Sequence, residues 1–217
     1  MALTKMIAIE YNMWMSIIKL IDDIIKSSIM SYDGLKHISN IPVLPAYPRD
    51  LTKFGKPSII IQKVDTENTP PCFGGFLGQY HDIDTNTCLD TFGVYYESTY
   101  QIDVCGNNNT QRSLLSAVLV DELLNNIRFN NNNKIEIFNY ALSLDNPPLM
   151  GYARLHQDID IQNLDKKYRS DNEYKLYNND YVTAIRFDIS MLQVIIPGNQ
   201  DLVDLTKPIK INQKIRL

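Results

Sequence analysis

The chain has 217 residues, of which 44% are hydrophobic and 21% are charged, so it can bury a core of ordinary size and wholesale disorder is excluded. One domain spanning residues 1–217 fits this length better than two separate cores. Its 21 Lys and Arg residues against 25 Asp and Glu residues give a formal net charge of -4, without the basic footprint of a nucleic-acid-binding protein.

Two features of the sequence indicate a protein of the cytosol. Charged residues such as Lys5 and Glu10 interrupt every apolar stretch near the N-terminus, so neither an export signal nor a membrane-spanning helix is expected. The three cysteines, Cys72, Cys88 and Cys105, are odd in number and lack C-x-x-C spacing, which favours reduced thiols. A loop disulfide between Cys72 and Cys88 is the alternative.

Residues 1–31 predict an N-terminal amphipathic helix that begins near Leu3 and ends near Ser31. Apolar residues recur there at alternating spacings of four and three, namely Ile7, Tyr11, Trp14, Ile18, Ile21 and Ile25. Four more apolar residues widen this stripe: Met6, Met13, Ile17 and Ile24. The helix therefore contacts more than one neighbour, in its own subunit or in an adjacent chain, or it is simply well buried.

A connecting segment and a first strand follow. Pro42, Pro45, Pro48 and Pro57 exclude a regular helix, so this segment is expected to be an ordered, extended arm. Residues 58–64 contain three consecutive isoleucines and predict a buried strand, the first of the sheet.

Residues 65–91 predict a long hairpin without regular structure of its own, because glycine, proline, asparagine and aspartate are frequent there. From Phe92 to Val104 apolar and polar residues alternate for thirteen positions, which is the strongest strand pattern in the chain. We therefore expect the hairpin to project from one edge of the sheet and to bind a partner.

The second half of the chain predicts one helix and three further strands. Asn107 to Asn109 provide a turn and an N-cap, and a helix follows to about Arg128. Its apolar face is expected to consist of Leu114, Ala117, Val120, Leu124 and Ile127. Strands are expected at residues 134–142, 152–161 and 181–196, with a polar connection at 162–179 and a C-terminal arm at 198–217 that has apolar residues but little periodicity.

These elements predict an α+β fold. A mixed or antiparallel sheet is expected to carry the N-terminal helix and the second helix, with the long hairpin and the C-terminal arm as excursions.

Few residues point to catalysis. His81, Asp82 and Asp84 are echoed by His156, Asp158 and Asp160, and imidazole and carboxylate groups together can bind a divalent metal. The same residues equally describe a hydrated polar edge of a strand. There is no G-x-S-x-G motif, and the glycines at 74, 75 and 78 lack the Lys-Ser/Thr of a phosphate-binding loop. We therefore expect no enzyme, no cofactor and no metal site.

The strand with Tyr96, Tyr100, Ile102, Asp103 and Val104 leads through an asparagine turn into the second helix, after an N-terminal helix. This order resembles the tail-terminator and tail-completion (neck ring) proteins of tailed bacteriophages, over about residues 1–130 and less completely over 181–196. The chain departs from the smaller members in its 65–91 hairpin, its 143–180 region and its C-terminal tail. Those departures leave open whether it is a terminator, another neck protein or a baseplate component.

The resemblance implies a structural virion protein that assembles in the host cytoplasm and closes into a ring, six-membered in that family. Such a ring caps the tail tube and joins it to the neck or head connector, and in contractile phages it also meets the sheath. No membrane and no sequence-specific nucleic acid is implied. We expect the contact surface to include Cys72, Phe73, Phe76, Leu77 and Tyr80 of the hairpin and Tyr11 and Trp14 of the N-terminal helix. A metal-dependent enzyme that uses the His and Asp clusters is the alternative.

Overall fold

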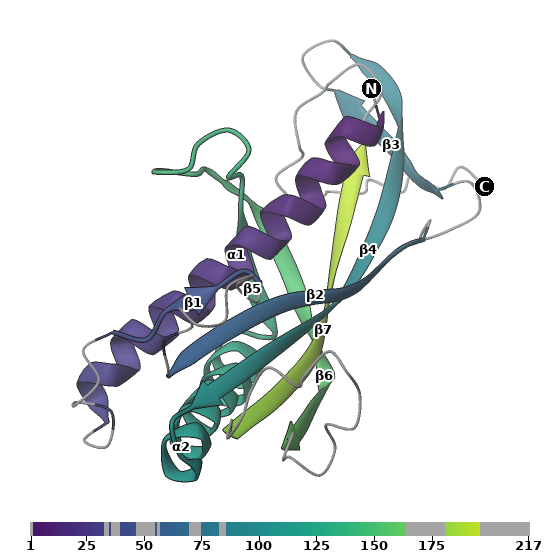
Figure 1. Ribbon diagram of the computed structural model, residues 1–217. Coiled ribbons are helices and arrows are strands. Elements are labelled where there is room, and N and C mark those ends of the chain that lie inside the picture. Colours follow the sequence, from purple (N-terminus) through teal and green to yellow (C-terminus); the bar gives the residue numbers. More distant parts are fainter. Residues whose placement is uncertain are drawn as a thin grey trace.

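The computed structural model describes residues 2–32, 35, 40–46, 55, 57–69, 75–82, 86–163 and 181–195. Its centre is one curved sheet of seven strands in the order β1-β2-β4-β7-β6-β5, with β3 also paired to β4 (Figure 1). The strands are β1 (Val43–Leu44), β2 (Ser58–Thr69), β3 (Phe76–Asp82), β4 (Thr87–Gly106), β5 (Lys134–Phe138), β6 (Leu149–Asn163) and β7 (Tyr181–Ile195). Only β1 and β2 are parallel, so the sheet is mixed and the α+β prediction is confirmed.

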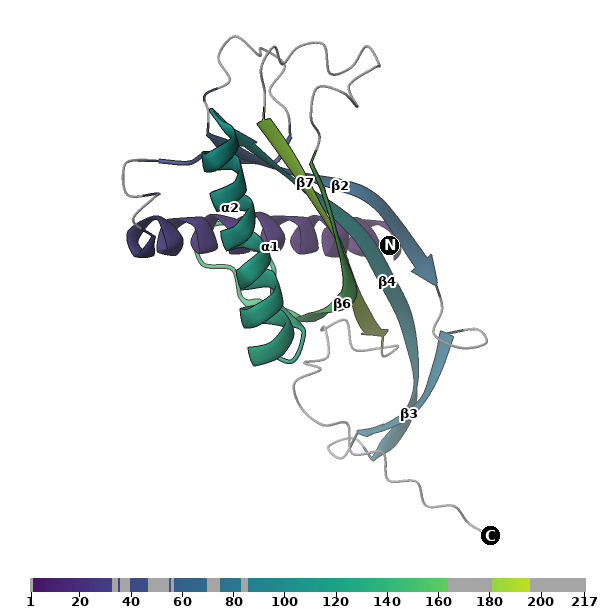
Figure 2. The same cartoon turned by 90° about the horizontal axis from the view of Figure 1, so that it is seen from below.

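Two helical segments cover the same face of this sheet. They are α1 (Ala2–Ser31) and α2 (Asn109–Asp121), which continues into the π-helical turns η4 (Glu122–Asn130) (Figure 2). Both contribute to a single hydrophobic core with the inward side chains of β4 and β7. At its centre the rings of Tyr100 and Phe187 stack with their centroids 6.0 Å apart. No helix among the described residues has an apolar stretch long enough to span a membrane.

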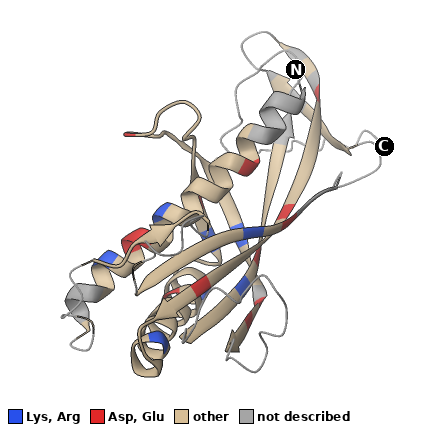
Figure 3. Ribbon diagram, viewed as in Figure 1, with Lys and Arg blue, Asp and Glu red and all other residues tan. Residues whose placement is uncertain are grey.

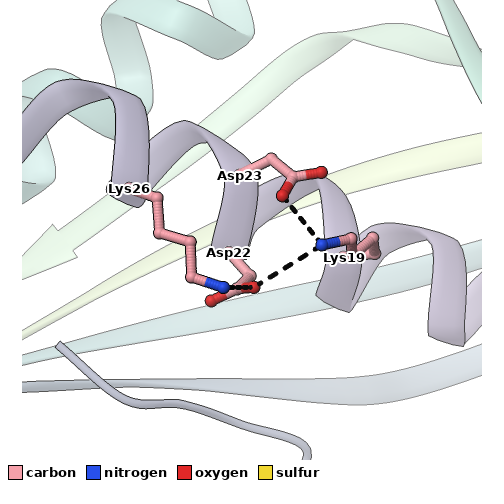
Figure 4. A network of polar contacts seen from close by, with 4 residues as sticks. All are labelled: Lys19, Asp22, Asp23 and Lys26. Atoms are coloured by element: carbon pink, nitrogen blue, oxygen red, sulfur yellow. Dashed lines mark hydrogen bonds and ion pairs between the residues drawn. The ribbon is translucent and has the colours of Figure 1, made fainter. Parts of the chain in front are cut away.

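The helix α1 confirms the N-terminal prediction and settles the meaning of its wide apolar stripe. Met13, Ile17 and Ile24 are buried in the chain's own core, so for these residues the wide stripe reflects burial within the subunit. The opposite face carries ion pairs at helical spacing, in which Lys19 contacts Asp22 and Asp23, and Lys26 contacts Asp22 (Figure 4). Each such exposed pair contributes only tenths of a kcal/mol.

Polar groups also contact the helix on both sides of its buried apolar face. On one side Lys63 of β2 forms an ion pair with Glu10 at 2.8 Å. On the other side the Ser16 hydroxyl accepts a hydrogen bond from the Phe138 amide at 2.9 Å, and the buried Asn12 side chain accepts one from the Ala141 amide at 3.1 Å. These bonds satisfy backbone groups that would otherwise lose their hydrogen bonds beneath the helix.

The second helix begins as predicted, but its buried face is rotated from the predicted one. The Asn108 side chain caps the helix by accepting a hydrogen bond from the Gln111 amide at 2.8 Å. Ala117 is exposed, whereas the core receives Leu115, Leu119, Leu123 and Ile127. These core residues are spaced four apart. Four residues are slightly more than one turn of α-helix and slightly less than one turn of the wider π-helix η4, so the two deviations offset each other and the same face stays inward across the junction.

Several strand boundaries differ from the sequence prediction. The strand expected at 134–142 ends at Phe138, because α1 binds the backbone of the following turn. Both β2 and β6 are longer than expected, so residues 65–69 and 162–163 are strand rather than loop. In the connecting arm, Val43 and Leu44 pair with β2. The region 164–180 and the C-terminal arm from residue 196 lie outside the described residues.

Candidate interaction surfaces

The clearest candidate surface is a two-stranded ribbon formed by β3 and the first part of β4. Strand β2 stops pairing with β4 at Tyr95, and β7 stops at Phe92. Beyond Phe92, β4 pairs only with β3 among the described strands, in a register that places Asp82 opposite Thr87. The ribbon therefore extends beyond the part of the sheet that the helices cover (Figure 2).

This ribbon corrects the expectation that residues 65–91 lack regular structure. The sequence predicted that this segment projects from the sheet. It did not predict that the segment forms paired strands, because frequent glycine and proline residues indicated a loop. The base is anchored by an edge-to-face contact between Phe76 and Phe92, with centroids 5.9 Å apart. Leu77 lies over Gly93, where a Cβ atom would come within 2.6 Å of the leucine Cδ1. Gly93 thus leaves room for the leucine that fastens the ribbon to the sheet.

The structure divides the seven predicted interface residues between two elements. Phe76, Leu77 and Tyr80 lie on β3, where Phe76 is 45% exposed and Leu77 is partly buried. Tyr11 and Trp14 are partly exposed on α1, and Trp14 packs against the main core. Cys72 and Phe73 lie outside the described residues. Cys88, on the ribbon, is an exposed thiol that is not in a disulfide, and Cys105 is a buried thiol.

The two His and Asp clusters do not come together. His81 pairs across the ribbon with Cys88, whereas His156 Nδ1 lies 3.3 Å from a Glu97 carboxylate oxygen. Nine residues separate Cys88 from Glu97 on β4 (97 − 88), which is about 30 Å along an extended strand. His81 instead contacts Asn86 at 3.2 Å.

Neither cluster gathers three ligands in the described part of the chain. Asp160 accepts a hydrogen bond from Gln162 at 2.6 Å, and Asp158 is exposed. The pairing of β6 with β7 is irregular between Leu155 and Ile159, so His156 and Asp158 lie in a bulged stretch and Asp160 lies beyond it, where pairing with Arg186 resumes. Asp82 ends β3, and Asp84 lies outside the described residues.

The sheet face opposite the helices carries a hydrogen-bonded polar ladder between β4 and β7. Arg186 Nε donates to the Gln101 side chain at 2.6 Å, and Gln101 Nε2 donates to the Asp103 carboxylate at 2.7 Å. One row along, the Thr99 hydroxyl donates to Asp188 at 2.6 Å. Along the described helices and strands, acidic and basic residues are interspersed (Figure 3). The ladder fixes strand register and offers neither a basic groove nor a large field of one sign.

Tyr96 and Tyr100 lie on the helix-facing side of β4, and their burial in the core disfavours loss of the phenolic proton. Burial raises the pKa of Tyr100 far above its ordinary value, and nearby Glu10 raises it further. Burial also raises the pKa of Tyr96.

These shifts predict a loss of stability at alkaline pH. A tyrosine in the unfolded chain releases its proton near pH 10, whereas Tyr100 keeps its proton in the folded state. Above pH 10 the unfolded state therefore binds fewer protons, and the free energy of unfolding falls as the pH rises. In urea titrations from pH 8 to 11, Tyr100→Phe should show a shallower decline than the wild type. An equal decline in both proteins would contradict the assignment to Tyr100.

A second exposed apolar surface was missed in the sequence. The loop between β5 and β6 projects beside α1 (Figure 1) and exposes Leu142 by 75% and Leu144 by 67%. The sequence predicted a strand as far as residue 142, so this exposed surface was not expected. Leu142 and Leu144, followed by the Pro147-Pro148 pair, are nevertheless typical of a turn with apolar side chains. The Asn12 side chain fixes the start of this loop by donating to Asn139 at 3.1 Å.

A groove of about 810 Å³ lies between α1 and the edge strand β5. Its lining combines apolar side chains, including Leu20, Ile135 and Phe138, with charged ones such as Asp23 and Glu136. A hydrogen bond to Asp23 raises the pKa of Lys19 on the helix wall. The volume suits a small ligand or a short stretch of peptide.

No protein-family model matches the sequence, and no curated protein matches it either. Function is therefore inferred from the surfaces above.

Proposed function

We propose that this chain is a structural assembly subunit, and specifically a tail-terminator or neck-ring protein of a tailed bacteriophage. The ribbon of β3 and β4 carries this proposal. A two-stranded ribbon is marginally stable in water unless a third strand or another surface packs against it. Residues 76–82 and 87–91 form such a ribbon with no further strand beside it among the described residues. A neighbouring subunit or tail protein would supply the missing surface.

Exposed apolar side chains at two separate places add support. Phe76 lies at the ribbon, and Leu142 and Leu144 lie on the loop that follows edge strand β5. A closed ring needs two different surfaces on each subunit, because a head-to-tail contact joins one patch to another. We expect a homo-oligomeric ring, hexameric as in the proteins that the sequence resembles.

The proposed partners follow from the same resemblance. They are the tail tube, the neck or connector, and in a contractile phage the sheath, and the proposed location is the tail or neck of the virion. The main alternatives are another neck protein and a baseplate protein. A metal-dependent enzyme is less well supported, because His81 and Asp82 lie on the ribbon, far from His156 beside Glu97.

Shortening the ribbon tests the role of this surface in assembly. Gly78 lies directly opposite Thr91, so Asn-Gly can replace residues 79–90 as a two-residue turn. The Phe76–Phe92 and Leu77–Gly93 contacts remain, and we expect a melting temperature within a few degrees of the wild type. We expect ring formation to be lost, as measured by native mass spectrometry and by electron microscopy.

A substitution outside the ribbon provides the control. Phe129→Ser removes a 65% exposed aromatic side chain from η4 and should leave assembly unchanged. A shortened protein that still forms normal rings would show that the ribbon is not the contact. Some ring proteins close only on their target, so wild-type chain and purified tail tubes should also be mixed. A wild-type chain that stays monomeric and does not bind tubes would overturn the proposed function.

A further inference from the structure

The edge strand β5 presents unused backbone groups to the groove beside α1. The Leu155 amide donates to the Asn133 carbonyl at 2.8 Å, so odd-numbered residues of this strand bond to β6. Even-numbered residues therefore direct their amides and carbonyls away from the sheet. The Phe138 amide is satisfied by Ser16, and that of Lys134 by the Asn131 carbonyl. Among the described residues, no strand pairs with this side of β5, so the outward backbone groups of Glu136 offer a docking point at the sheet edge.

The side chains around this edge have two characters. Toward the helices, Ile135 is buried, and Leu20 and Ile127 also line the groove. Toward the other face, Glu136 is exposed, and Lys134, two residues earlier on the same face, is exposed as well. An extended strand would match this site if apolar side chains alternated with cationic ones along it.

The last ten residues of the chain have that pattern, although residues 199–217 as a whole have little periodicity. After Pro208, the apolar positions are Ile209, Ile211, Ile215 and Leu217, and the cations between them are Lys210, Lys214 and Arg216. This segment contains three of the 21 cations and no acid, so the other 207 residues carry 18 − 25 = -7. Residues 208–217 are therefore cationic and alternate like a strand, whereas the rest of the chain is acidic. This charge difference favours docking of the segment on a copy of the same protein.

We infer that residues 208–217 of a neighbouring copy add to β5 as an extra strand and occupy the groove beside α1. This inference rests on the proposed self-assembly and names one of its contacts. Twelve residues, 196–207, separate the end of β7 from the segment and can span about 40 Å. The chain's own β5 lies only two strand spacings from β7, about 10 Å, so the spacer is about 30 Å longer than that separation requires. In the docked strand the isoleucines face Ile135 and Leu20, and the cations face Glu136.

A complementation experiment with full-length chains tests this contact. Glu136→Pro removes the outward amide that the added strand needs, and proline is tolerated on an edge strand. A tail variant, Ile209→Ser with Ile211→Ser and Ile215→Ser, keeps all charges but removes the apolar side. We expect each variant alone to lose assembly and their equimolar mixture to form a dimer through one intact tail and one intact groove. Glu136→Ala keeps the amide and should retain most of the assembly.

A labelled peptide of residues 205–217 measures the same contact without ring closure. With the tail variant as acceptor, we expect anisotropy to show saturable binding that weakens as salt rises. Adding Glu136→Pro to the acceptor should lower the affinity about tenfold or more. A peptide with the same residues in scrambled order is the control and should not bind.

The outcomes separate this inference from the proposed function. If both variants assemble like the wild type, the tail contact is wrong and the proposed assembly stands. If the peptide binds the groove but the mixed variants do not associate, the tail docks on its own chain and the neighbouring-copy contact is overturned. If the peptide does not bind and the wild type neither self-associates nor binds tail tubes, both proposals fail.

Discussion

Phe187→Ala is expected to lower the free energy of unfolding by about 4 kcal/mol. The ring of Phe187 is 2% exposed and stacks on Tyr100 at the centre of the sheet, beneath the helices. Its removal loses buried apolar area and leaves a cavity that the surrounding strands cannot close, because they are fixed by pairing on both sides. Guanidinium titration of monomer at one fixed protein concentration measures the loss.

The same truncation at an exposed phenylalanine is the control. Phe129 is 65% exposed at the end of η4, so Phe129→Ala should change the free energy of unfolding by no more than about 0.5 kcal/mol. A loss below about 1 kcal/mol for Phe187→Ala would mean that the described core is not the principal core of the protein.

Gly106→Ala is expected to lower the free energy of unfolding by roughly 2 to 3 kcal/mol. Gly106 ends β4, and a Cβ atom there would come within 2.7 Å of the Arg112 backbone nitrogen and 3.0 Å of its Cα. Backbone atoms of a packed helix cannot move aside like the end of a flexible side chain, so α2 would have to shift from the sheet. Urea denaturation and the near-ultraviolet circular dichroism of the core tyrosines report this shift.

Another glycine supplies the matched control for this substitution. A Cβ atom at Gly55 would meet nothing within 4 Å, so Gly55→Ala should leave the stability unchanged or raise it slightly by restricting the unfolded chain. If Gly106→Ala is as well tolerated as Gly55→Ala, the close approach of α2 to the end of β4 is wrong.

Local patterns were sufficient for the main elements of the fold. The four-and-three spacing of α1, the alternation from Phe92 to Val104 and the asparagine cap at Asn108 each depend on residues a few positions apart. These patterns correctly predicted the helices, the long central strand and the α+β class. They failed where a distant element contributes to the outcome, as after Phe138, where Asn12 of α1 binds the backbone amide of Ala141 in the turn that follows the strand.

The candidate contact surface was predictable only in part. The length of the 65–91 segment correctly indicated a projecting hairpin, but β3 pairs with β4 although its segment contains Gly78, and the Pro70-Pro71 pair lies outside the described residues. The exposed leucines at 142 and 144 were concealed, because exposure of an apolar side chain depends on which elements cover it. The distance between the two His and Asp clusters likewise became apparent only from the register of β3, β4 and β6.

By itself, then, the sequence determined the two helices and the central parts of the long strands, since hydrophobic periodicity and capping act over one or two turns of chain, but not the strands β1 and β3. Tertiary structure alone decided which side of α2 is buried, where β5 ends, and that β3 and the first part of β4 extend from the sheet as a pair with no further strand beside it among the described residues. The physical reason is that pairing and burial are set by contacts between residues far apart in the chain, such as Tyr100 with Phe187 and Asn12 with Ala141, whose free energy outweighs local preference.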